Sequence, residues 1–228
     1  MISLLNLSFA LIDLCLLVYL LKMPLPKQAI IQLPRVFICA LLCGMTYDNL
    51  VVASGYWFIQ ESWFATINIP RFYLHVLVLP FLSLFTYAII RQSGIALGKS
   101  PLFFAFCLLV TISALAYGIS HELVNLQLVE KSAFGITRMS NANSSAPMAT
   151  IVTNIVTLIL AGYLWRKSGW KILFLGALFI FVVNGASATQ AWGFLAGNFA
   201  EIIFVLSLIT TLKHFSTSTT GATQEATK

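Results

Sequence analysis

Seven long runs of apolar residues dominate the pattern of this sequence, and polar residues fall mainly between them. The runs are continuous rather than alternating, and each is close to the ~20 residues with which a helix crosses a ~30 Å hydrocarbon layer. Because unpaired backbone groups are not tolerated in lipid, continuous runs predict helices and not barrel strands. The expected spans are Ile2–Leu21, Val36–Phe58, Phe72–Ile90, Leu102–Ile119, Ala149–Trp165, Ile172–Ala191 and Leu195–Leu212.

We therefore expect an all-α, polytopic membrane protein with a single seven-helix transmembrane domain over residues 1–215. The last residues, 216–228, are small and polar, and we expect them to be a disordered tail. Composition agrees, since 59% of the 228 residues are hydrophobic and 9% are charged, which excludes a soluble globular domain.

The positions of the 13 Lys and Arg residues predict an orientation. Only Arg71, Lys131 and Arg138 lie on one side of the predicted spans, and the other basic residues lie on the opposite side. The positive-inside rule therefore predicts an outside N-terminus and a cytoplasmic C-terminus, in the cell membrane or inner membrane if the host is bacterial. The formal charge of +6 follows from this topology, and no nucleic-acid partner is expected.

Two features interrupt the simple pattern. Pro80 lies in the middle of an apolar run, where it is expected to kink the helix and free a carbonyl group about one turn earlier. The long connection at 119–146 mixes apolar and charged residues. Its first half could form an interfacial helix or a lid over a cavity, and a plain exposed loop is an equally good interpretation.

No cofactor and no metal are expected. The sequence contains no Walker motif, GxSxG, HExxH or dinucleotide fingerprint, and only three His residues. A retinal protein is disfavoured, because the last span carries Glu201 where a retinal-binding Lys would be needed. The four Cys residues all lie inside predicted spans, which argues against a disulfide framework or a zinc site: Cys15, Cys39, Cys43 and Cys107.

Polar residues inside the spans gather at one depth, toward the side that we expect to be outside. A charged group in hydrocarbon costs at least ~2.5–3.5 kcal/mol, so these groups are expected to cluster and satisfy one another. For a single Asn or Gln, such as Asn154 or Gln190, an interhelical hydrogen bond is the alternative. Asp13 could join the cluster or bond to a backbone carbonyl. The layer contains Asp48, Asn49, Arg71, His75, His121, Glu122, Asn154, Asn184, Gln190, Asn198 and Glu201.

Aromatic residues surround this layer. Trp57, Trp63 and Trp192 are typical of an interfacial belt. Tyr47 and Phe199 each lie within two residues of a buried acid, so we expect them to line a cavity. A carboxyl group in apolar, aromatic surroundings is expected to hold its proton and to be able to donate it. Asp48 is therefore expected to be the proton donor of a catalyst or the proton-binding site of a carrier.

The two acids, Asp48 in "MTYDNLVV" on the second span and Glu201 in "GNFAEIIF" on the seventh, carry a resemblance. In length, helix count and these acids the chain resembles the small seven-helix membrane-bound terpene cyclases of meroterpenoid pathways. The resemblance implies acid-initiated cyclisation of an isoprenoid-type lipid substrate, an isomerase or lyase reaction, with Asp48, Glu201 and His75 as catalytic residues. The implied substrate-binding residues are Tyr47, Asn49, Arg71, Phe72, Tyr73, His121, Glu122, Asn154, Asn184, Asn198 and Phe199.

Two other functions stay open on the sequence. A small proton-coupled transporter with three, one and three helices would also need intramembrane carboxyl groups. A lipid-binding membrane protein without turnover would instead satisfy its polar layer internally. Membrane lipids are the expected surroundings in every case.

Overall fold

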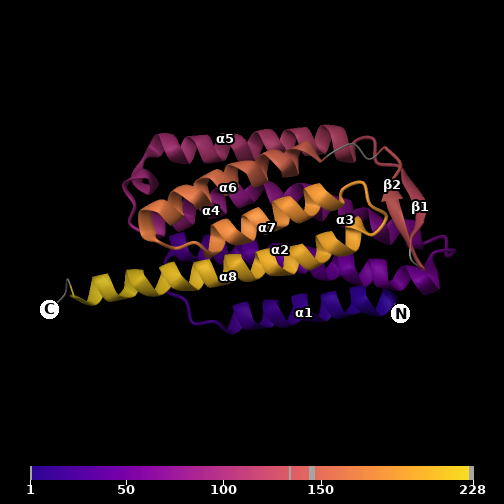
Figure 1. Ribbon diagram of the computed structural model, residues 1–228, viewed down its shortest axis with the longest axis horizontal. Coiled ribbons are helices and arrows are strands. Elements are labelled where there is room, and N and C mark those ends of the chain that lie inside the picture. The colour runs from indigo at the N-terminus through magenta and orange to yellow at the C-terminus, as the bar shows by residue number, and fades with distance from the viewer. Residues whose placement is uncertain (1, 134, 144–146, 226–228) are drawn as a thin grey trace.

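The apolar runs form helices that lie side by side in one bundle, with a small β-hairpin at one end (Figure 1). The computed structural model describes residues 2–133, 135–143 and 147–225. Shorter segments are the 3₁₀ helices η1 (Leu79–Phe81) and η2 (Ala96–Lys99), the π-helical segment η3 (Ile119–Leu123), and the strands β1 (Leu128–Ala133) and β2 (Ile136–Asn141). The helices are α1 (Ile2–Lys22), α2 (Ala29–Phe58), α3 (Phe64–Val78), α4 (Leu82–Gln92), α5 (Pro101–Gly118), α6 (Met148–Ser168), α7 (Ile172–Ser187) and α8 (Gly193–Glu225).

Six stretches in the described chain are long and apolar enough to cross a membrane, and α7 is a shorter apolar helix. The prediction of a multi-pass helical membrane protein is thereby confirmed, whereas its orientation stays a prediction. The sequence predicts that α7 reaches Ala191, but it ends at Ser187, where the N–H of Gln190 turns back to the Ser187 carbonyl (2.9 Å). With 16 residues, α7 is about 24 Å long, less than a ~30 Å hydrocarbon layer.

Proline residues shape two of the spans. α2 begins before the predicted Val36 and contains Pro34, which cannot donate to the carbonyl of Ile30. The side-chain amide of Gln92, on α4, donates to that carbonyl instead (2.7 Å), so the proline is accommodated inside the helix. The α-helix is interrupted at Pro80, where η1 separates α3 from α4, and the predicted kink stays a prediction.

The connection after α5 is neither a helical lid nor a plain loop. It forms η3 and then an antiparallel hairpin in which Leu128 pairs with Asn141 and Ala133 with Ile136. The hairpin packs on α2 and α3 through Met139, which is buried against Val51 and Phe64. We call this end of the bundle the hairpin end. The sequence predicted an all-α fold, and the hairpin was not expected.

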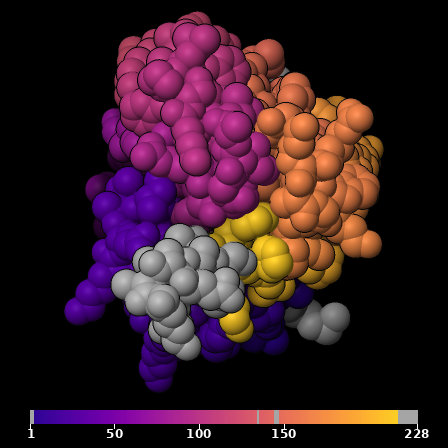
Figure 2. Space-filling view, turned by 90° about the vertical axis from the view of Figure 1, so that its left-hand side faces the viewer, coloured from indigo at the N-terminus to yellow at the C-terminus, as the bar shows by residue number. Residues whose placement is uncertain are grey.

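The apolar core lies toward the opposite end. All of the α-helices except α3 contribute buried residues to it, and α2, α4 and α8 provide many of them, such as Ile38, Phe85 and Leu208. Figure 2 looks onto that end, where the α1–α2, α4–α5 and α6–α7 connections appear in indigo, magenta and orange. α8 continues past the core as far as Glu225, into the segment for which the sequence predicts disorder, because an established helix extends at little cost. Residues 226–228 of that tail lie outside the described residues.

Candidate functional site

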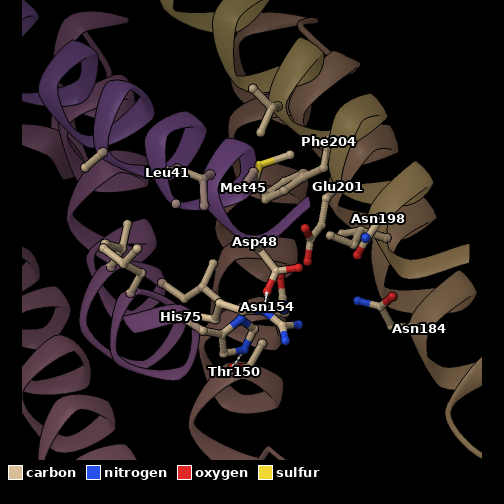
Figure 3. A pocket seen from close by; sticks show the side chains of 18 of the residues that line it. Leu41, Met45, Asp48, His75, Thr150, Asn154, Asn184, Asn198, Glu201 and Phe204 are labelled. Atoms are coloured by element: carbon tan, nitrogen blue, oxygen red, sulfur yellow. Dashed lines mark hydrogen bonds and ion pairs between the residues drawn. The ribbon is translucent and has the colours of Figure 1, made fainter. Parts of the chain in front are cut away.

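A cavity of about 260 Å³ lies within the bundle near the hairpin end (Figure 3). Its walls come from α2, α3, η1, α6, α7 and α8. The residues follow helical spacing: Leu41, Gly44, Met45 and Asp48 on α2 are three or four positions apart and therefore share one face. Seven predicted site residues meet in this cavity: Asp48, Arg71, His75, Asn154, Asn184, Asn198 and Glu201.

The cavity is polar at one end and apolar at the other. Toward the hairpin, it is lined by the acids, amides and basic groups of the predicted layer. Toward the core, its lining is apolar, with Leu41, Val78, Ile180, Phe204 and Val205. Such a lining matches a ligand with an apolar body and a polar end.

Asp48 is held by an ion pair. Its Oδ1 accepts a hydrogen bond from Arg71 Nε at 2.8 Å, and the Arg71 side chain is 8% exposed. Arg71 Nη1 also donates to Asn68 Oδ1 (2.7 Å) and to the carbonyl of Met139 on β2 (3.2 Å). The guanidinium group therefore compensates the Asp48 charge and ties the hairpin to the bundle.

Glu201 differs from Asp48 in this respect. Figure 3 shows the two carboxyl groups pointing toward one another across the cavity. Among the described residues, however, no hydrogen bond or ion pair is made by the side chain of Glu201, and the same holds for Asn154 and Asn184. Three side chains thus face the cavity with their polar groups unused, which is what a ligand site requires.

His75 stands between this cavity and a second one. Its Nε2 lies 3.3 Å from Thr150 Oγ1, so the ring is oriented by α6. The second cavity, of about 310 Å³, adjoins the first along Asp48, Arg71 and His75. It lies under the hairpin, and its remaining lining residues are Phe72, Val76, His121, Glu122, Asn141, Asn143 and Pro147.

Four predicted site residues line neither cavity. The Tyr47 hydroxyl donates to the carbonyl of Ile67 (2.7 Å), and the ring packs beside Val51. Tyr73 and Phe199 are 44% and 50% exposed on outer faces of their helices. Neighbours in sequence point about 100° apart on a helix, so proximity to an acid in the chain did not place Tyr47 or Phe199 beside it in space.

Asn49, the fourth, belongs to a buried chain of polar groups that meets the first cavity only at Asn198. Its Nδ2 donates to Asp13 Oδ2 (3.1 Å), and its Oδ1 accepts from Asn198 Nδ2 (2.7 Å), which also lies 3.4 Å from Asn6 Oδ1. Asp13 and Asn6 are fully buried. Asp13 therefore bonds to a side chain of α2, and neither cavity includes it.

Three further residues contact side chains of the site, and the sequence did not predict these contacts. Asn68 and Thr150 orient Arg71 and His75, and only the i, i+3 spacing of Asn68 and Arg71 could have indicated one of these contacts. Phe194 lies under the guanidinium group of Arg138, with 4.6 Å from Cζ to the ring centroid. Burial, and then the positive charge of Arg71, lower the pKa of Arg138 from its ordinary value, while Asp48 opposes this.

Comparison with protein-family models, with curated proteins and with solved structures gives no match for this chain. In the described part of the chain, no group of three or more His, Cys, Asp or Glu side chains is placed to hold a metal ion. The site is therefore interpreted from its own geometry.

Proposed function

We propose that this protein is an integral membrane enzyme that cyclises an isoprenoid-type substrate by acid catalysis, with Glu201 as the proton donor. The observation that carries the proposal is that only one of the two facing acids has an ion-pair partner. Asp48 has a cationic partner at 2.8 Å, whereas Glu201 faces the same cavity without a partner among the described residues. Two carboxyl groups in different surroundings can take two different roles, one as a charged group and one as an acid.

The charges of the site suit this division. A charge on Asp48 is compensated by Arg71, so the pair can stay ionised inside the bundle. In the described part of the chain no cationic side chain pairs with Glu201, so this residue is the one to carry a proton in the resting enzyme. Asp48 and Arg71 then act as a fixed dipole that orients the polar end of the substrate.

The reaction balances with the residues of the cavity alone. Glu201 gives its proton to the less substituted carbon of the terminal double bond, or to the oxygen of an epoxide, and a tertiary carbocation forms as that π bond or C–O bond opens. A second double bond attacks the cation to close the ring. The ring of Phe204 lines the cavity and can stabilise the positive charge, whereas the ring of Phe194 already lies against Arg138. His75 removes a proton from the carbon beside the final cation, and the product is an isomer of the substrate.

The shape of the cavity supports an amphiphilic substrate. Its apolar end lies deep among α2, α3, η1, α7 and α8, where the middle of a folded isoprenoid chain would be shielded from water while the chain's reactive terminus folds back beside Glu201. Its polar end lies near the hairpin. A transporter would need charged or amide groups beyond the cavity as well, whereas the buried polar side chains described among the core residues there are hydroxyl groups such as Ser83, Thr86 and Thr211. Catalysis is therefore the function that this geometry favours.

The test is conversion of prenylated aromatics and their terminal epoxides by the purified protein in nanodiscs. We expect an isomer of at least one substrate, with unchanged mass and a new retention time in chromatography with mass spectrometry. Glu201→Gln should lower the rate by about 10²–10⁴-fold, because general acid catalysis contributes that much. Glu130→Gln, the same exchange at an exposed position of β1, is the matched control and should keep the parental rate.

Conversion by Glu201→Gln at the parental rate would refute the proposal. Proton flux into liposomes that disappears in Glu201→Gln, without any conversion of substrate, would instead support the transporter. Tight retention of an isoprenoid without flux or conversion would support a lipid-binding protein.

A further inference from the structure

The second cavity has features of its own that the proposed chemistry does not use. It contains about 310 Å³ and lies between α3, η3 and the hairpin. It meets the first cavity along Asp48, Arg71 and His75, so one elongated ligand can extend from one to the other. Apart from Phe72, Val76 and Pro147, every residue in its wall is polar or charged.

Glu122 reaches this cavity because of an irregularity in the backbone. α5 ends at Gly118 and continues as one turn of π-helix, closed by a bond from Val124 N to Ile119 O (3.1 Å). Such π-helical turns are rare and are frequent at functional sites. Here the turn places His121 and Glu122 in the cavity wall.

His121 and Glu122 differ in whether their polar atoms already have hydrogen-bond partners. The His121 ring stacks on Tyr117 (4.0 Å between centroids), and its Nδ1 lies 2.8 Å from Ser120 Oγ, so its position is fixed by its own segment. Glu122 Oε1 is buried and has no hydrogen-bond partner among the described residues. A buried carboxyl oxygen without a donor is costly, and such groups usually await a ligand or water.

The neighbouring charges decide which donor fits. Arg71 lines the same cavity, and Arg138 lies close enough to Arg71 for its pKa to be lowered by that charge. Counting Asp48, which pairs with Arg71 in the same wall, the two guanidinium groups still leave one positive charge near Glu122, and this disfavours an ammonium ion. A neutral hydroxyl group can donate a hydrogen bond to a Glu122 oxygen and adds no charge beside the guanidinium groups.

We infer that the second cavity binds a hydroxyl-bearing head group of the substrate, with Glu122 as the residue that accepts its hydrogen bond. This inference rests on the proposed function, in that the first cavity holds the isoprenoid chain of the same molecule. It adds a specificity determinant: the substrate carries a free hydroxyl group at its polar end, and the ether of that group is a poor ligand.

The experiment measures direct binding of two radiolabelled probes, farnesol and farnesyl methyl ether, to the protein in nanodiscs, with empty nanodiscs as the blank. The wild-type protein should bind farnesol at least about tenfold more tightly than the ether, because the ether leaves the Glu122 oxygen unpaired. Glu122→Leu should bind both probes alike, at the affinity that the wild type shows for the ether. Glu122→Gln keeps a carbonyl oxygen as acceptor and should keep the preference.

Equal binding of the two probes by the wild-type protein, or binding of neither above the blank, would overturn the inference. So would a preference for the alcohol that survives in Glu122→Leu. The proposed catalysis fails independently: if Glu201→Gln turns over substrate at the parental rate while the Glu122-dependent preference is observed, the head-group site stands and the acid mechanism does not.

Discussion

Two buried polar regions flank α2, and they differ in what surrounds them. Asp48 faces the cavities, where Glu201, Asn154 and Asn184 keep unused polar groups. Asn49, the next residue, points about 100° away into the chain of side chains that ends at Asp13. We call the first region the cavity cluster; it comprises Asp48, Arg71, Asn154, Asn184 and Glu201. We call the second region the closed cluster; it comprises Asn6, Asp13, Asn49 and Asn198.

The comparison shows that a buried acid does not identify a site by itself. Asp13 is fully buried and its Oδ1 has no partner among the described residues, so by burial alone it resembles a catalytic acid more than Asp48 does. What separates the two clusters is space. The cavity cluster adjoins two hollows large enough for parts of a ligand, whereas neither hollow reaches Asp13. We therefore assign chemistry to the cavity cluster and helix packing to the closed cluster.

The largest expected effect on folding comes from breaking the ion pair of the cavity cluster. Arg71→Leu leaves the Asp48 charge without its partner and removes the bond to the Met139 carbonyl, so the free energy of unfolding should fall by about 2–4 kcal/mol. The measurement is equilibrium unfolding in mixed micelles. The double variant Asp48→Asn with Arg71→Leu should recover part of the loss, since no charge is then left unpaired. Losses that simply add in the double variant would mean that the two side chains are not coupled.

Substitutions in the closed cluster should have a smaller effect, and this effect should be on the free energy of unfolding and not on turnover. Asp13→Leu removes the acceptor of the Asn49 amide and should cost about 1–2 kcal/mol in the same unfolding assay. Asp13→Asn keeps an oxygen for that amide and should restore most of the loss. Both variants should convert substrate within threefold of the parental rate. A loss of turnover in stably folded Asp13→Asn would place the closed cluster in the chemistry and remove the distinction between the two regions.

The smallest effects should come from single aromatic rings, and they should differ between a ring in the cavity wall and a ring on an outer helix face. Phe204→Leu removes a ring from the cavity wall and should lower turnover by about tenfold, as expected for a lost cation–π contact. Phe199→Leu makes the same exchange at a side chain that is 50% exposed, and turnover should change by less than about twofold. The ratio of the two rates is the measurement. Equal losses would show that the carbocation is not held against Phe204.

The sequence was sufficient to predict the helices and the polar layer, because both depend on local pattern. An apolar run of about 20 residues has few alternatives to a helix, and a charged group in hydrocarbon must find a partner. The seven residues that meet in the first cavity were all predicted to lie at one depth. The i±3 and i±4 neighbours of Asp48 and Glu201, among them Met45, Asn198 and Phe204, line the cavity with them.

Contacts between distant segments could not be predicted in the same way. Nothing local links Arg71 to Asp48 rather than to Glu201, and the choice depends on how α2 and α3 pack. The hairpin was missed because strand pairing is a property of two segments, and neither LVEKSA nor ITRMSN alone resembles a strand more than a loop. Tyr47 and Phe199 were wrongly placed at the cavity, because closeness in sequence was used where helical spacing decides.

The central claim is that the Glu201 carboxyl group delivers a proton to carbon. It is tested most directly by a single turnover in D₂O with a substrate that ends in an alkene, followed by mass spectrometry of the product. The exchangeable proton of Glu201 is then deuterium, so the cyclised product should carry one carbon-bound deuterium at the less substituted carbon of the former terminal double bond, and Glu201→Gln should form labelled product at least about 10²-fold more slowly. Cyclised product without carbon-bound deuterium, or labelled product formed at the parental rate by Glu201→Gln, would contradict the account.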